Sequence, residues 1–430
     1  MALNVRFMAG PGLLEQARGL TREQRNAFLA AWLGWAMDAF DYFLVVFVLS
    51  NIAETFGVSE TRVALTTTLT LIARPIGALV FGIWADKVGR RIPLMVDVLF
   101  YSVMEVLSGL APSLTVLLVL RFLFGLGMGG EWGLGASLAL EKIPAEKRGF
   151  WSGLLQQGYP VGYLLATLAN FAITPFLSWR WLFILGAVPA LIAFLIRTRV
   201  GESEAWEKTQ ERVELTQVGP GRVFLQPKVL RRFLYLIVLM SLFNLMSHGT
   251  QDYVPTFLKG PEFHASTTAV TVIAVIYNLG AIIGGAYFGA LSERLGRRRT
   301  AAVCALTAVP VAFLFAYSTV LGLVTLGAFL LQVLVQGGWG VIPAHLAELS
   351  PDEVRGFYPG VTYQLGNAVA SVVLPLQVAL GKSHGGSFAL AVVIVPVLVA
   401  TALVLLLGPE AKGAVFGRER EPEPTGGAAS

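Results

Sequence analysis

Long apolar segments alternate with short polar ones along almost the whole chain, and this pattern predicts membrane-spanning helices. Each segment reaches about 20 residues, the length an α-helix needs to cross roughly 30 Å of hydrocarbon. The connections are short except at residues 201–228, where a charged stretch with helical patterning precedes Gly-Pro-Gly. We predict twelve spans, at 27–52, 63–84, 92–111, 114–140, 149–174, 180–200, 232–257, 266–291, 300–319, 321–346, 357–381 and 386–408.

Composition excludes a soluble protein and several kinds of enzyme. Of the 430 residues, 55% are hydrophobic and only 14% are charged, against about 25% charged in soluble domains. Cys304 is the single cysteine and the four histidines are scattered, so the sequence has no disulfide, no multi-cysteine metal site and no redox pair. It also lacks the phosphate-binding loop of an ATPase. We therefore expect an all-α membrane protein that uses no cofactor or metal and is not an enzyme.

The distribution of positive charge predicts the orientation in the membrane. Of the 32 lysines and arginines, 26 fall in the tails and alternate connections, four fall in the opposite connections, and Arg74 and Arg121 lie inside spans. This bias places both termini in the cytoplasm of a multi-pass protein of the cell inner membrane. It also explains the net charge of +5 without a nucleic-acid partner. The predicted parts are a cytoplasmic segment 1–26, six-helix bundles 27–200 and 232–408, a cytoplasmic loop 201–231 and a disordered cytoplasmic tail 409–430.

The two halves of the chain are copies of each other at a constant offset of 207 residues. An even number of spans per half makes the copies parallel, and transporters built from such repeats bind substrate between them. The offset aligns Gly82, Gly89, Arg90 and Arg91 with Gly289, Gly296, Arg297 and Arg298, and Glu141, Arg148 and Gly149 with Glu348, Arg355 and Gly356.

Two stretches carry a resemblance to a known family. Gly82–Arg91 (GIWADKVGRR) resembles the signature loop of the major facilitator superfamily. Asn244–Thr256 (NLMSHGTQDYVPT) is similar to the signature of its sialate/lactate–proton symporter branch, which includes fungal lactate permeases and bacterial sialic acid transporters. The resemblance implies the twelve-helix major facilitator fold and suggests substrate contact at Gln364 and Asn367. The bacterial sialate members carry extra spans that this chain lacks, which favours the monocarboxylate side.

Polar residues form one stripe along the seventh span. Asn244, His248, Gln251 and Asp252 occupy positions i, i+4, i+7 and i+8 of a helix. Ionisable groups at membrane depth are costly and are therefore functional candidates. An amide, an imidazole and a carboxylate in line can bind an anion and pass a proton, so we predict substrate contacts at Asn244, His248 and Gln251 and proton coupling at His248 and Asp252. The alternative is a buried network that only fastens helices together.

Charged residues in the first half are the other candidates. The guanidinium of Arg121 can hold a carboxylate through two parallel hydrogen bonds, and its copy position is Ala328. We predict that Arg121 binds substrate, with a structural salt bridge as the alternative. Asp38 and Asp41 lie one turn apart, and like charges that close oppose joint ionisation, which makes them candidate proton carriers. The alternative is that one of them pairs with Arg74 or Arg121.

The signature loop is interpreted as a gate. Its charges can latch the two halves together at the cytoplasmic side and release them on reorientation, although control of topology alone is also possible. The predicted gating residues are Gly82, Asp86, Gly89, Arg90, Arg91, Glu293 and Arg297.

These features favour a secondary active transporter that carries a small monocarboxylate, such as lactate or pyruvate, together with a proton by alternating access. The alternative substrate is sialic acid or another larger organic anion. An intramembrane enzyme would need a catalytic couple, and adjacent Ser247 and His248 point about 100° apart on a helix. The expected partners are a small organic anion, a proton and the bilayer, with the chain working as a monomer.

Overall fold

The computed structural model describes residues 19–174, 176–198, 201–216 and 219–417, and helices make up nearly all of this part. Residues 1–18 of the predicted N-terminal segment and residues 418–430 of the predicted C-terminal tail lie outside the described residues. The first half contains α2 (Arg22–Phe47), α3 (Leu49–Phe56), α4 (Glu60–Val88), α5 (Arg91–Gly109), α6 (Leu114–Lys142), α7 (Arg148–Gln156), α8 (Gly158–Ile173) and α9 (Arg180–Arg197).

The second half repeats this order after a short helical linker. The linker contains α10 (Glu204–Thr216) and α11 (Pro220–Phe224). The second half contains α12 (Pro227–Gln251), α13 (Val254–Lys259), α14 (Thr267–Leu295), α15 (Arg297–Tyr317), α16 (Leu321–Leu349), α17 (Tyr358–Ala370), α18 (Val373–His384) and α19 (Gly386–Leu407).

The helices account for the predicted spans. Within the described residues, ten helical segments are long and apolar enough to cross a membrane. The fifth predicted span is divided at Gln157 into α7 and α8, and α9 covers most of the sixth. The all-helical fold is therefore confirmed.

Local sequence sets where the helices begin and end. Thr21 and Gln24 form a reciprocal capping box at the start of α2, which satisfies backbone N–H groups that the first turn leaves unpaired. At the other end, α4 and α14 stop at Gly89 and Gly296, with φ of 102° and 93°. Side chains other than glycine avoid that region. The two stops are related by the repeat offset.

The helices pack as two bundles, and one helix of each also packs on the other bundle. We call α2–α9 the N bundle and α12–α19 the C bundle. In the N bundle α4 packs on α6, and in the C bundle α14 packs on α16; α7 leaves the N bundle to contact α14 and α16, while α17 contacts α4 and α6. These bridging helices, α7 and α17, hold the bundles together.

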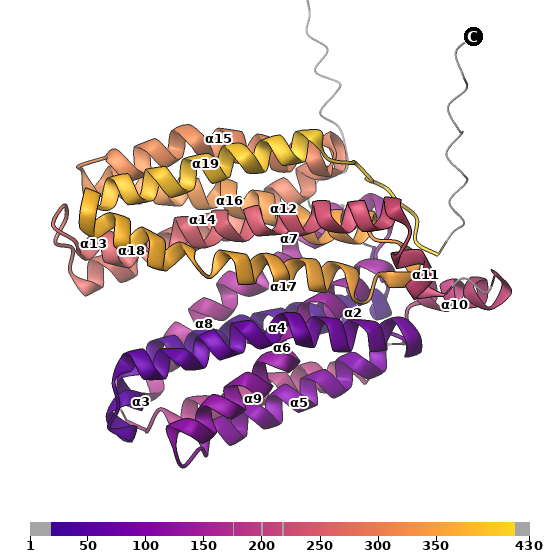
Figure 1. Cartoon of the computed structure of the whole chain (residues 1–430), viewed down its shortest axis with the longest axis horizontal. Coiled ribbons are helices and arrows are strands. Elements are labelled where there is room, and N and C mark those ends of the chain that lie inside the picture. The colour runs from indigo at the N-terminus through magenta and orange to yellow at the C-terminus, as the bar shows by residue number, and fades with distance from the viewer. Residues whose placement is uncertain (1–18, 175, 199–200, 217–218, 418–430) are drawn as a thin grey trace, which may run out of the picture.

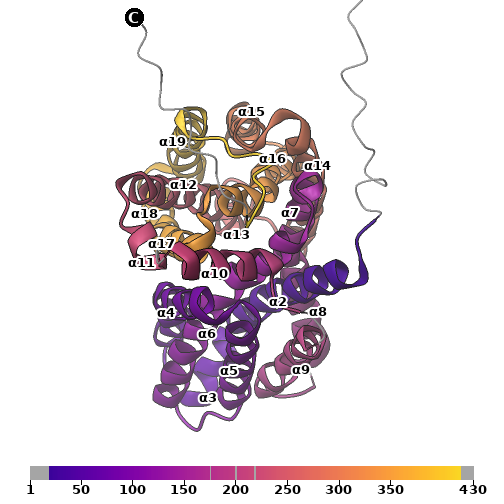
Figure 2. The same ribbon diagram turned by 90° about the vertical axis from the view of Figure 1, so that its right-hand side faces the viewer.

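Figures 1 and 2 show the two bundles side by side, with the linker helices at one end. We call the end with α10 and α11 the linker end, and the end with α3, α13 and α18 the far end (Figure 1). The bundles lie close at the linker end, where α17 meets α4, and their helices diverge toward the far end. The space between the bundles is where the candidate site lies.

Candidate functional site

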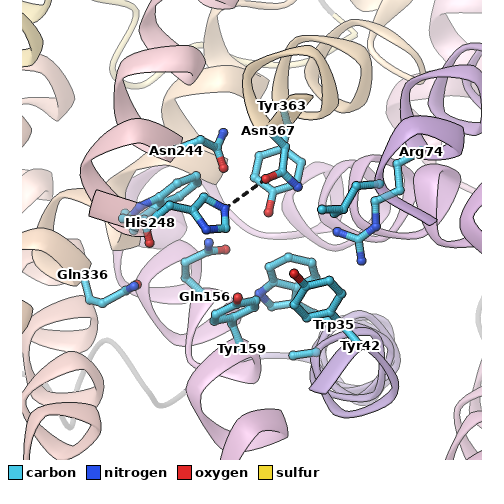
Figure 3. A pocket seen from close by; sticks show the side chains of 14 residues that line it. Trp35, Tyr42, Arg74, Gln156, Tyr159, Asn244, His248, Gln336, Tyr363 and Asn367 are labelled. Atoms are coloured by element: carbon cyan, nitrogen blue, oxygen red, sulfur yellow. Dashed lines mark hydrogen bonds between the residues drawn. The ribbon is translucent and has the colours of Figure 1, made fainter. Parts of the chain in front are cut away.

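A small cavity lies between the bundles, about halfway along the helices. Its free volume is about 40 Å³, enough for only a few water molecules. Figure 3 shows the imidazole of His248 and the guanidinium of Arg74 on opposite sides of it. The N bundle contributes Trp35, Ala39, Tyr42, Leu71, Arg74, Gln156 and Tyr159, and the C bundle contributes Asn244, Ser247, His248, Gln336, Trp339, Tyr363 and Asn367.

Aromatic rings close this central cavity toward the linker end. Trp132 of α6 stacks on Tyr363 of α17 with ring centroids 4.4 Å apart, and Trp339 meets the same ring edge-on at 5.8 Å. Beside them the α6 and α17 backbones come so close that a Cβ on Gly133 would lie 2.7 Å from the Gly360 Cα. No substrate can pass this layer without separation of the bundles.

A larger cavity leads from the central one toward the far end. This vestibule has a free volume of about 410 Å³ and shares Tyr42, Tyr159, Ser247 and His248 with the central cavity. Asp252 borders it with its side chain 36% exposed. The site is therefore open toward the far end and closed toward the linker end.

The cation in the central cavity is Arg74, held by one carboxylate. Its Nη2 donates to both Asp38 carboxylate oxygens at 3.2 Å, and the two side chains are only 6% and 2% exposed. The other terminal nitrogen, Nη1, makes no hydrogen bond to a described residue, and Arg74 borders the cavity. This guanidinium can accept a second carboxylate, most readily when protonation of Asp38 weakens the existing pair.

His248 is the ionisable group on the opposite wall. Its Nδ1 lies 2.8 Å from an Asp252 carboxylate oxygen, and its Nε2 lies 3.1 Å from the Asn367 amide oxygen. An imidazole that carries a proton on each ring nitrogen could donate to both of these oxygens. The arrangement can hold a proton between the vestibule and the central cavity.

The other predicted polar residues are divided among three places. Asn244 borders the central cavity, with its amide nitrogen 2.8 Å from the Met240 carbonyl. Gln251 borders the vestibule, where it donates to the Gln332 amide oxygen at 3.1 Å. Gln364 is buried and borders neither cavity, and its amide has no partner among the described residues. The structure thus brings Asn244, His248 and Asn367 together but leaves Gln364 outside.

Arg121 lies away from both cavities, inside the N bundle. It forms an ion pair with Glu105, both groups being at most 1% exposed, and its guanidinium lies 3.9 Å from the Phe124 ring centroid. The prediction that Arg121 binds substrate does not fit this position, because Glu105 already neutralises it; the salt-bridge alternative describes it. Likewise Asp38 pairs with Arg74, while Asp41 is buried with its Oδ1 unbonded among the described residues.

The signature loop and its copy lie at the linker end, across the junction between the bundles. The Asp86 carboxylate accepts the N–H groups of Gly356 and Phe357 at 2.6 and 3.2 Å and pairs with Arg90 at 2.7 Å. The copy does the same in reverse, since Glu293 accepts the N–H of Gly149 and pairs with Arg297 at 3.1 Å.

Two further ion pairs cross the junction with the same symmetry. Arg148 of the N bundle pairs with Glu348 of the C bundle at 3.2 Å, and Arg355 of the C bundle pairs with Glu141 of the N bundle at 3.6 Å. Not every predicted gating residue crosses the junction. Arg91 donates instead to the Thr198 carbonyl at 2.9 Å, within the first half of the chain. Gly82 does lie at the junction, where it allows the close approach of α4 to the Phe357 backbone.

Several residues of the central cavity were not predicted as binding residues. The sequence predicts Arg74 as a counter-ion or a helix-packing residue, and none of the aromatic residues that line the cavity is predicted to bind. The repeat offset contained a usable signal, since it relates Gln156 to Tyr363 and Trp132 to Trp339. All four lie at this layer of the junction, so aligned polar or aromatic residues within spans are informative.

A repeated pair of membrane-spanning bundles with a cavity between them, open at one end and latched at the other, defines a membrane transporter of the alternating-access class. The family model of the Major Facilitator Superfamily matches residues 31–261 and 253–428. The chain belongs to the major facilitator superfamily.

Comparisons with known proteins agree with this class. The chain is 28% identical over 398 residues to the sialic acid transporter NanX of Escherichia coli (strain K12), covering 91% of this chain and 96% of that one. It is 28% identical to a carboxylic acid transporter protein homolog of Saccharomyces cerevisiae, covering 86% and 64%. The structure of the proton:xylose symporter XylE has a TM-score of 0.73 at 17% identity, covering 92% and 98%, and shares the fold.

Proposed function

We propose that this transporter carries an organic monocarboxylate, such as lactate or pyruvate, together with one proton. The observation that supports this most strongly is the Arg74–Asp38 pair, in which Arg74 borders a cavity between the bundles and its Nη1 makes no hydrogen bond to a described residue. The substrate carboxylate binds Arg74 while Asp38 takes the proton. His248 and Asp252, at the vestibule, pass that proton inward.

Charge balance explains why the two solutes move together. In the empty site the positive charge of Arg74 is cancelled by the negative charge of Asp38. Addition of a carboxylate and a proton leaves this balance unchanged, whereas addition of either alone leaves a net charge. Closing the cavity around a net charge costs several kcal/mol or more in a low-dielectric interior. Only the empty and the doubly loaded states therefore cross between the two orientations readily.

We propose that the linker end faces the cytoplasm of the inner membrane, as the excess of lysine and arginine in its loops indicates. The state described here then faces outward, with its latch closed on the cytoplasmic side. Lowering the external pH accelerates uptake, because it loads Asp38.

The test is uptake of labelled lactate into proteoliposomes with an imposed pH gradient. We expect Arg74→Ala to abolish uptake, and Arg74→Lys to retain part of it because the charge remains. Asp38→Asn is expected to lose gradient-driven uptake by about a hundredfold while exchange of internal for external substrate persists, since a neutral side chain mimics the loaded state. Wild-type uptake that ignores the gradient would contradict proton coupling.

A second candidate substrate is a larger organic anion such as sialic acid. The vestibule, about 410 Å³ in volume and lined by several aromatic and polar residues, favours it, as does the similarity to NanX over 91% of this chain. Competition of lactate, pyruvate and sialate for the same labelled uptake separates the two.

A further inference from the structure

The segment that follows α19 lies across the linker end rather than trailing away from it. Figures 1 and 2 show it running from the end of α19 toward α10. The Glu410 carboxylate accepts the Arg298 N–H at 3.0 Å, and the Gly417 N–H donates to the Asp352 carboxylate at 3.1 Å. The prediction of a disordered tail from residue 409 is therefore wrong for residues 409–417, because polar contacts and one buried ring fix them.

That ring belongs to Phe416, which lies between two guanidinium groups. The Arg148 Cζ is 3.7 Å from the ring centroid and the Arg355 Cζ is 3.8 Å from it. Phe416 is 9% exposed and packs in a cluster that includes Phe150 of α7 and Ala205 of α10. A ring desolvated between two cations is attracted to both through its π faces.

The two arginines are repeat-related and come from opposite halves of the chain. Each also reaches across the junction, Arg148 to Glu348 and Arg355 to Glu141. We call these ion pairs, together with the contacts of Asp86 and Glu293 across the junction, the latch. Most of its contacts are thus present twice, once in each half. Phe416 has no such counterpart, since the equivalent position in the first half is Thr209 of α10. The single Phe416 ring therefore contacts one arginine from each half of the chain, Arg148 and Arg355.

We infer that residues 410–417 form a strap that stabilises the closed linker end and must leave the space between Arg148 and Arg355 before that end opens. The ring bridges the two cations only while both bundles are together. Backbone hydrogen bonds on both sides hold Phe416 in this position. The Ala414 carbonyl accepts a hydrogen bond from Arg148 at 2.8 Å, and the Gly417 N–H donates one to Asp352. Separation of the bundles breaks at least one of the two ring contacts.

This inference rests on the alternating access of the proposed function but not on its substrate, so it can be tested without transport. Cys304 is buried and is the single cysteine. In a Cys304→Ala background, spin labels at Glu146→Cys and Arg299→Cys, both exposed, report the separation of the bundles at the linker end. Labels at Glu54→Cys and Lys259→Cys, also exposed, report the far end.

We expect Phe416→Ala to raise the ratio of linker-open to linker-closed molecules about tenfold, the scale of a desolvated cation–π contact. Phe416→Leu keeps an apolar side chain without a π face and is expected to show most of the same change. Phe416→Tyr keeps the ring and leaves the ratio unchanged, as does the matched control Val415→Ala, whose side chain is 51% exposed.

Asp86→Asn, which weakens the latch directly, is the positive control. If Asp86→Asn shifts both distance distributions and neither Phe416→Ala nor Phe416→Leu does, the strap is not part of the latch. Failure of the proposed function looks different: no carboxylate uptake by the wild type, with the distance changes of the Phe416 variants intact.

Discussion

The two bundles descend from one repeat, yet their interiors carry different chemistry. The N bundle buries two ion pairs, Arg74–Asp38 and Arg121–Glu105. None of these charges has an ionisable counterpart in the C bundle. The offset of 207 aligns Arg74, Asp38, Arg121 and Glu105 with Ala281, Leu245, Ala328 and Ala312.

The C bundle instead surrounds the cavities with amides. Gln251 donates to Gln332 at 3.1 Å, and Gln332 donates to the Thr250 hydroxyl at 3.1 Å. Gln332 and Gln336 occupy the positions of Gly125 and Gly129, where α6 packs directly on the α4 backbone. The N bundle thus carries buried ion pairs, whereas the C bundle carries amide hydrogen bonds beside the single His248–Asp252 pair at the cavities.

This difference between ion pairs and amide hydrogen bonds determines how much stability a substitution in each bundle should cost. Removing one partner of a buried ion pair leaves an uncompensated charge and costs about 3–5 kcal/mol. A neutral hydrogen bond contributes about 1 kcal/mol net. We therefore expect the N bundle to be sensitive to single substitutions in its interior and the C bundle to be more tolerant.

The largest expected effect is at the Arg121–Glu105 pair. Arg121→Met leaves the Glu105 carboxylate unpaired inside the N bundle, and we expect about 3–5 kcal/mol of lost stability. The double variant Arg121→Met/Glu105→Leu removes both charges and should recover most of that loss. Thermal unfolding in detergent, measured for the wild type, both single variants and the double variant, gives the coupling energy.

The same variants decide whether Arg121 also has a part in transport. If its role is structural, the stable double variant transports substrate at a rate near that of the wild type. A stable double variant with no gradient-driven uptake would contradict the structural assignment. It would indicate that Arg121 takes part in proton-coupled transport.

How far the sequence predicted this molecule differs between its fold and its site. The helices, the repeat and the gating loop follow from patterns that repeat physically, namely apolar length and the fixed offset. Hydropathy and offset place a residue along a helix but not around the bundle. Asp38 and Arg121 are therefore equally prominent in the sequence, although one adjoins a cavity residue and the other meets Glu105.

Two predictions that the described contacts do not support have the same origin. Gln364 lies one turn before Asn367 on α17, yet only Asn367 borders the central cavity. The tail from residue 409 has a polar, glycine-rich composition, which predicts disorder although the tail contains one aromatic residue, Phe416. Which face of α17 turns to the cavity, and which residues surround Phe416, depend on segments that are distant in the sequence, so no local pattern records them.

The next effect concerns the C-bundle amides. Asn367→Leu removes the oxygen that faces Nε2 of His248 at 3.1 Å. Because hydrogen bonds to a charged group contribute about 1.5–3 kcal/mol, we expect the KM for uptake to rise about tenfold. Gln251→Leu, which breaks a neutral amide pair, is the matched control and should raise KM about threefold at most. Equal KM values for both variants would show that the amide beside His248 contributes no more than its neighbours.

The smallest expected effect compares one residue type at matched positions of the two repeats. Trp132 stacks on Tyr363 across the junction between the bundles, whereas Trp339 contacts Tyr363 and Phe243 within its own bundle. An aromatic pair contributes about 0.5–1.5 kcal/mol beyond its buried area. Trp132→Phe should therefore raise the fraction of linker-open molecules about threefold, while Trp339→Phe should leave that fraction unchanged because its contacts move with the C bundle. The spin-label pair at the linker end measures both. If both variants changed the fraction of linker-open molecules equally, the aromatic layer would act as one unit. The two bundles would then differ in their charged residues but not in their aromatic ones.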